Sequence, residues 1–117
     1  MKHFNLMEFD SPDLPGSGGL MNREFLMKLD TAREMADTSF VITSGYRTKE
    51  HNTRVGGVSG SSHTLGLAAD IKCSDSRERS LIVSGLLRAG FNRIGIANTF
   101  IHVDLDTNKK QNVIWTY

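Results

Sequence analysis

Two histidines and one aspartate have the residue types and spacing to hold a metal ion. His63 and Asp70 are seven positions apart, and three of the residues between them are glycine or alanine. His102 follows in an apolar run typical of a strand, with Asp104 two positions further on. Two imidazoles and one carboxylate are a sufficient protein ligand set for a catalytic zinc ion, which keeps one position open for water. The sequence therefore predicts a site for one Zn²⁺ ion made by His63, Asp70 and His102.

Each of these residues, taken singly, has a plainer explanation. A histidine in a strand is more often a core or surface residue than a ligand, and an aspartate after two alanines can cap an element or form a turn. The combination with a strand-borne His102 and Asp104, and with Arg47 after Gly45-Tyr46, makes chance a poor explanation. A binding domain without metal, and a module that keeps the metal without catalysis, remain as alternatives.

The helices expected to position these residues follow from apolar spacing and cap residues. Asn22 is a suitable N-cap for the first helix, and Ser74 or Ser76 for the last. Gly90 then ends the last helix as the residue just beyond its C-cap. Helices are predicted over about 22–37, 49–54 and 76–89.

The strands expected to position them are short apolar or alternating runs. In residues 67–73, alternation places Ala68 and Asp70 on one face. A tight turn at Asn98-Thr99 joins the third and fourth strands. Strands are predicted over about 40–43, 67–73, 93–97, 100–105 and 113–117. The fold class is α+β, with a mostly antiparallel sheet of four to five strands flanked by two main helices.

The N-terminal residues 1–20 are predicted to form an extended arm and loop. Residues 11–19 hold both prolines and three glycines, so regular structure is not expected there. Phe4, Leu6 and Phe9 are expected to fix this arm to the body of the domain.

Composition places the chain among ordinary globular domains. Its 117 residues make one domain, and its net charge of +1 gives no basic face for nucleic acid. The single cysteine, Cys73, excludes an internal disulfide and is expected to be a small buried residue. No apolar run reaches the roughly 20 residues that span a bilayer, and the N-terminus does not have the pattern of a signal peptide. We expect a monomer made in the cytoplasm, without membrane insertion.

Five short segments between Phe40 and Leu105 form a pattern with a known counterpart. They are Ser44-Gly45-Tyr46-Arg47, His51-Asn52, Val55-Gly56-Gly57, Ser61-x-His63-x-x-Gly66-x-Ala68-x-Asp70 and Phe100-Ile101-His102-Val103-Asp104. Together they resemble the zinc D-Ala-D-Ala peptidase family. That family includes D-Ala-D-Ala carboxypeptidases and dipeptidases, and the L-alanyl-D-glutamate endopeptidases of phage endolysins. Its architecture is shared with lysostaphin-type peptidases and the hedgehog signalling domain.

The resemblance implies roles for individual residues. His63, Asp70 and His102 match the zinc ligands. Arg47 matches the arginine that holds a substrate carboxylate or carbonyl, or the oxyanion of the intermediate. Ser61 matches a serine that lines the substrate cleft.

One position departs from the family pattern. Many members carry the catalytic Glu or Asp three residues before the last histidine, and that position is Thr99 here. We predict Asp104 as the replacement general base, which takes the proton of the water and passes it to the leaving amine. The alternative is that Asp104 orients a histidine ligand.

The function implied by the resemblance is hydrolysis of an amide bond in the peptide stem of bacterial peptidoglycan. We expect a phage or prophage endolysin that acts at the cell wall or periplasm after release. A bacterial wall-remodelling D,D-carboxypeptidase and a non-catalytic metal-binding or wall-binding module of the same fold are the alternatives. Residues near the C-terminus have structural explanations. Trp115 and Tyr117 could flank the cleft or close the core, and the sequence favours the core, while Lys109-Lys110 is expected to be a solvated turn.

Overall fold

The computed structural model describes all 117 residues. The first 20 residues contain two 3-10 helices, η1 (Leu6–Phe9) and η2 (Ser17–Leu20). The remaining elements, in chain order, are α1 (Arg23–Ala36), β1 (Ile42–Ser44), α2 (Lys49–Arg54), η3 (Ser62–Leu65), β2 (Ala68–Lys72), α3 (Ser76–Arg88), β3 (Arg93–Ile96), β4 (Phe100–Asp104) and β5 (Val113–Thr116). All predicted helices and strands are present, with ends that differ by at most two residues.

A single five-stranded sheet has the order β1-β2-β4-β3-β5. The first three pairs are antiparallel, whereas β5 runs parallel to β3. The loop after β4 therefore only crosses the end of β3, because β4 ends and β5 begins beside the first residues of β3. The α+β fold class and the mostly antiparallel sheet are confirmed.

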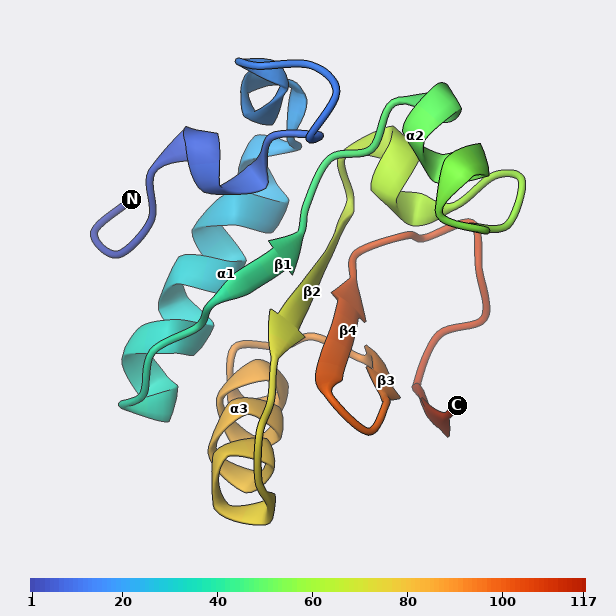
Figure 1. Cartoon of the computed structure of the whole chain (residues 1–117). Helices are drawn as coiled ribbons and strands as arrows, with labels where there is room; N and C mark the ends of the chain where they lie inside the picture. Colours follow the sequence, from blue (N-terminus) through green and yellow to red (C-terminus); the bar gives the residue numbers. More distant parts are fainter.

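The two faces of the sheet differ in chemistry because side chains alternate along each strand. Ile71, Ile101 and Val103 point into the hydrophobic core, where α1 and α3 cover them from behind the strands (Figure 1). The alternate positions, including Asp70 and His102, face the opposite side. One layer of helices thus leaves the second face of the sheet free for a polar site.

The two main helices approach each other closely at Gly85 of α3. A Cβ atom there would lie 2.6 Å from the carbonyl oxygen of Ala32 and 2.6 Å from the Cβ of Ala36. Glycine and alanine at this contact allow α1 and α3 to pack together over the core.

The helix ends confirm two predicted caps and correct a third. The Asn22 side chain accepts a hydrogen bond from Phe25 N at 2.9 Å, and Gly90 has a φ of 97° just after α3. The N-cap of α3 is Asp75, not Ser74 or Ser76, because its carboxylate accepts from Glu78 N at 2.8 Å. A carboxylate at this position is also stabilised by the helix dipole.

The N-terminal segment is not an extended arm. The Asp10 carboxylate accepts hydrogen bonds from the amides of Gly16 and Gly18, which closes the glycine-rich stretch into turns. Phe4 and Phe9 are buried and meet edge to face at 5.4 Å, as expected, but Leu6 is exposed. The predicted arm and the observed turns differ because side chains accept hydrogen bonds from the loop amides. Apolar periodicity does not reveal such contacts.

None of the helices combines the length and the apolar character that a crossing of the bilayer requires.

Candidate metal centre

Three elements bring His63, Asp70 and His102 together. Asp70 on β2 and His102 on β4 are direct partners in the antiparallel register, so their side chains leave the same face of the sheet. His63 lies in η3, which leads into β2, and its carbonyl accepts from Arg47 N at 3.1 Å. One ligand atom from each residue lies within 4.8 Å of the other two.

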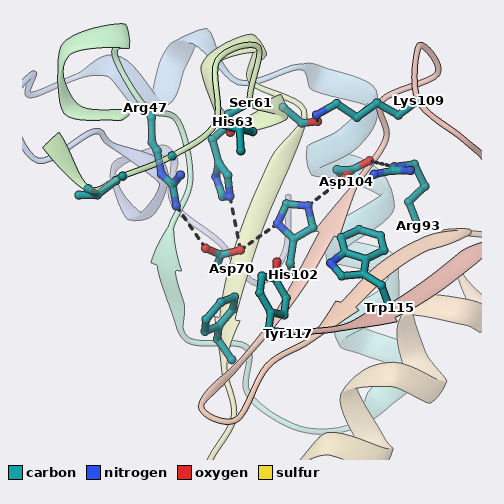
Figure 2. A pocket seen from close by; sticks show the side chains of 16 residues that line it. Arg47, Ser61, His63, Asp70, Arg93, His102, Asp104, Lys109, Trp115 and Tyr117 are labelled. Atoms are coloured by element: carbon teal, nitrogen blue, oxygen red, sulfur yellow. Dashed lines mark hydrogen bonds and ion pairs between the residues drawn. The ribbon is translucent and has the colours of Figure 1, made fainter. Parts of the chain in front are cut away.

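Asp70 is the centre of this cluster (Figure 2). Its Oδ1 lies 3.0 Å from His102 Nδ1 and 3.4 Å from His63 Nε2. Two ligands of a tetrahedral zinc ion, each about 2.0–2.1 Å from the metal, are separated by roughly 3.3 Å. The donor types and the two distances from Asp70 therefore suit a zinc ion, and the two imidazole nitrogens lie within 4.8 Å of each other.

Hydrogen bonding fixes His63 with one nitrogen directed into the cluster. Its Nδ1 lies 2.8 Å from the carbonyl oxygen of Gly45, an acceptor, so Nδ1 carries the hydrogen. The other nitrogen, Nε2, faces Asp70 and is the one that a metal ion could bind. A backbone carbonyl that holds the second nitrogen is the usual arrangement for a metal-binding histidine.

In His102 the two ring nitrogens have exchanged roles relative to His63. Its Nε2 lies 2.8 Å from Asp104 Oδ2, which leaves Nδ1 to face Asp70. The other oxygen of Asp104 accepts from Arg93 Nε at 2.7 Å and from Asp106 N at 3.2 Å. The Asp104 side chain is only 1% exposed. These contacts favour the alternative in which Asp104 orients a histidine over the prediction that it is the general base.

The charges of the cluster favour a bound cation. Burial raises the pKa of Asp70, but hydrogen bonds from His102 and His63 outweigh it and hold this pKa well below its usual range. Burial lowers the pKa of His102, but Asp104 and Asp70 outweigh it and raise this pKa. Asp70 is therefore anionic at neutral pH, and a metal ion bound here would compete with a proton for His102.

Arg47 contacts the cluster from the other side of Asp70. Its Nη2 lies 3.4 Å from Asp70 Oδ2, while its Nε donates to Ser44 and its Nη1 to Asn52. Ser61 caps η3, and its Oγ accepts from His63 N at 3.3 Å. Both residues line the same cleft as the cluster, as the resemblance implies.

This cleft has a volume of about 420 Å³. Trp115 and Tyr117 line it, so the prediction that they close the core is wrong. Trp115 is opposite Gly95 in the β3–β5 pair, and a Cβ atom on Gly95 would lie 2.6 Å from the indole. The missing side chain gives the indole room to lie 5.5 Å from the His102 ring, between ring centroids.

Lys109 corrects a second expectation. Its ammonium lies 2.9 Å from Ser62 Oγ and 3.6 Å from Asp106 Oδ2, at the edge of the cleft, whereas Lys110 is exposed. The turn is therefore solvated only in part. Neither Lys109 nor the buried Asp106 is recognisable from a local motif, because both depend on contacts with Ser62, more than 40 residues earlier.

Sequence reasoning also missed Arg93, which holds Asp104 and stacks on Trp115 with its guanidinium 5.0 Å from the ring. Alternation along β3 was the available signal, since Arg93 and Gly95 share the face that His102 occupies on β4. Thr99 lies outside the cleft, in a depression beside the buried Cys73. The position that carries an acid in many relatives thus has no carboxylate and does not reach the cluster.

The family model described as Peptidase M15 matches residues 2–104, which include all three candidate ligands. Comparison with curated proteins gives no match. The chain therefore belongs to the peptidase M15 family of zinc D-Ala-D-Ala peptidases, whose members are metal-dependent peptidases.

Proposed function

We propose that this protein is a zinc-dependent peptidase that cleaves an amide bond in the peptide stem of bacterial peptidoglycan. The observation that carries the proposal is the convergence of His63 Nε2, Asp70 Oδ1 and His102 Nδ1. Each imidazole uses its second nitrogen to contact a fixed acceptor. Membership of the peptidase M15 family supports the substrate class.

The ligand set proposed for the metal is His63, Asp70 and His102. When bound, zinc would supply Lewis-acid chemistry, polarising a carbonyl and lowering the pKa of water. The residues of the chain set up that chemistry: Gly45 and Asp104 fix the histidine tautomers, and the depressed pKa keeps Asp70 ionised.

Arg47 is proposed to stabilise negative charge that develops on the substrate carbonyl. Its guanidinium is held by Ser44 and Asn52, so its position is set before substrate arrives. Ser61 is proposed to line the substrate site, since it borders the cleft beside His63.

Asp104 is proposed to act through His102. Both of its oxygens accept hydrogen bonds from the protein, and it is shielded from solvent. The assignment of Asp104 as general base stays a prediction, and a variant described in the Discussion separates the two roles.

The biological role we propose is that of a phage or prophage endolysin acting at the cell wall or periplasm. It rests on the resemblance of the motifs to a family that includes the endopeptidases of phage endolysins. A bacterial wall-remodelling D,D-carboxypeptidase uses the same site chemistry, and the products of digestion distinguish the two.

A second candidate function is a metal-binding wall module without catalysis. Thr99, in the position of the usual acid, is the observation that favours it.

Digestion of purified peptidoglycan tests these proposals. We expect the zinc-loaded protein to release stem-peptide fragments, whose masses identify the bond, and His63→Ala to lose both zinc and activity. His51→Ala is the matched control, because His51 lies on α2 outside the cleft. Full activity of a metal-free His63→Ala protein would contradict the peptidase proposal, and zinc binding without product release would favour the module.

A further inference from the structure

We infer that Lys109 binds a carboxylate of the substrate, on the side of the metal cluster opposite Arg47. The site would then select peptides with an anionic group close to the cleaved amide, on the Lys109 side. This inference rests on the proposed function for the reaction, but its binding test does not depend on turnover.

Three cations line the cleft, and each is paired with an aspartate. Arg47 pairs with Asp70 and Arg93 with Asp104, while Lys109 pairs with Asp106. These charges cancel in pairs, so a divalent ion in the cluster would leave the cleft with surplus positive charge. A cleft of this kind favours an anionic substrate.

The three cations differ in how far a ligand can reach them. The side chains of Arg47 and Arg93 are 15% and 11% exposed, whereas that of Lys109 is 34% exposed. Arg93 is further covered by the Trp115 ring. Lys109 is therefore the cation most open to a bound carboxylate.

The contacts of Lys109 hold it in place and leave bonding capacity. Its ammonium has three hydrogens; Ser62 Oγ at 2.9 Å takes one, and Asp106 at 3.6 Å is beyond direct hydrogen-bond distance. Asp106 is satisfied without Lys109, since it accepts from Ser62 Oγ and from Asn108 N. The contacts with Ser62 and Asp106 therefore leave hydrogens of the Lys109 ammonium free to bind a ligand.

Position in the cleft relates Lys109 to the reaction. Figure 2 shows Lys109 reaching in from the loop after β4, while Arg47 lies on the far side of His63, Asp70 and His102. Ser62, which anchors the ammonium, directly precedes His63 in the chain. A peptide lying across the cluster from Arg47 would therefore pass this ammonium.

A paired-substrate experiment tests the inference. Two synthetic stem peptides would differ only in a D-glutamate that carries a free α-carboxylate or the matching carboxamide. The variants are Lys109→Gln, which can still donate to Ser62 but lacks the charge, and Lys109→Arg, which keeps the charge. Lys110→Gln is the matched control, because its exposed side chain does not line the cleft.

We expect Lys109→Gln to raise KM for the carboxylate peptide about fivefold to tenfold and to leave the carboxamide peptide unchanged. Lys109→Arg should restore most of the difference. Calorimetric titration of the zinc-loaded protein with the carboxylate and carboxamide product peptides should show the same pattern in Kd.

Equal effects on both peptides, or none, would overturn the inference. If the wild-type protein released no product, the peptidase proposal would fail, while the titrations would still decide whether Lys109 recognises the carboxylate. If Lys109→Gln did not fold, the wild-type protein and Lys109→Arg would decide. Equal binding of both peptides by the wild-type protein would overturn the inference, and so would the loss of the carboxylate preference in Lys109→Arg.

Discussion

Arg47 Nη2 lies 3.4 Å from Asp70 Oδ2, the carboxylate oxygen that faces away from both histidines. One oxygen of Asp70 is thus turned to the two histidine nitrogens of the candidate metal site and the other to a guanidinium. Arg47 consequently has two effects: it fixes the orientation of a ligand, and it borders the cleft where substrate would bind. The two effects can be separated by measurement.

Replacement of Arg47 by lysine should weaken both functions. Lysine cannot contact Ser44, Asn52 and Asp70 together, because its ammonium is a single point of charge. We expect a loss of about 10-fold to 100-fold in activity, with zinc affinity also reduced. Competitive zinc titration against a chelator, alongside peptide hydrolysis, measures the two effects. Arg54→Lys, at an exposed ion pair with Asp13, is the control; unchanged zinc affinity in Arg47→Lys would limit Arg47 to the substrate.

Replacement of Asp104 by asparagine distinguishes orientation from general-base catalysis. If Asp104 orients His102, the variant should bind zinc about 10-fold to 100-fold more weakly, since the histidine loses its charged acceptor. If Asp104 is only the base, kcat should fall while zinc affinity stays constant. Zinc titration of Asp104→Asn, with circular dichroism to verify the fold, gives the answer.

Removal of the metal should lower thermal stability. A ligand present at a hundredfold excess over its Kd stabilises the folded state by about 2.7 kcal/mol. We expect the melting temperature of the dialysed protein to rise on addition of zinc and to fall again with chelator. Magnesium should have no such effect, because it prefers an all-oxygen octahedral site. Identical melting curves with and without zinc would argue against the metal centre.

Replacement of Gly95 by alanine should displace Trp115 from the cleft wall. The added methyl group would lie 2.6 Å from the indole, too close for both to keep their positions. Trp115 is the only tryptophan, so its fluorescence reports the movement directly. We expect a shift in emission together with a raised KM. Gly19→Ala, where the added atom meets nothing within 4 Å, serves as the control. An unaltered emission spectrum of Gly95→Ala would mean that the backbone of the sheet shifts and Trp115 keeps its position.

Acid should release the N-terminal segment from α1. Burial raises the pKa of Asp30, but hydrogen bonds from the amides of Lys2 and His3 outweigh it and lower the folded-state pKa. The folded protein then binds fewer protons than the unfolded chain. The stabilisation is full above the unfolded pKa of about 4 and is lost as pH falls through the lower folded value.

Asp30→Asn makes this dependence measurable. We expect it to lower the free energy of unfolding by about 1–2 kcal/mol at pH 7. Urea unfolding of both proteins across the acidic range should show this difference shrinking as pH falls. A difference that stayed constant from pH 7 into strong acid would exclude the carboxylate as its source.

The fold was largely predictable because its elements are marked by local features. Apolar spacing located α1 and α3, and the runs around Asp70 and His102 located β2 and β4. What these features cannot supply is a contact between distant segments. The side-chain acceptors of Asp10 and Asp30 turned a predicted arm into ordered turns, and no periodicity shows them.

The candidate ligands were predictable for a different reason. His63, Asp70 and His102 carry a motif whose order and spacing are specific, whereas Arg93, Lys109 and Trp115 carry none. Those three depend on the parallel placement of β5 and on the loop that precedes it. Pairing direction at a sheet edge follows from the whole topology, so it could not be inferred from the last strand alone.

The segment that ends in β5 contributes to the cleft although it lies outside the range matched by the family model. The range shared with the family ends at Asp104, yet Lys109, Trp115 and Tyr117 all come from the tail that follows. If Lys109 binds the substrate as proposed, one determinant of selectivity lies outside the range that holds the candidate ligands. Under that proposal, grafting residues 105–117 onto a relative is expected to transfer a preference for a carboxylate near the cleaved bond.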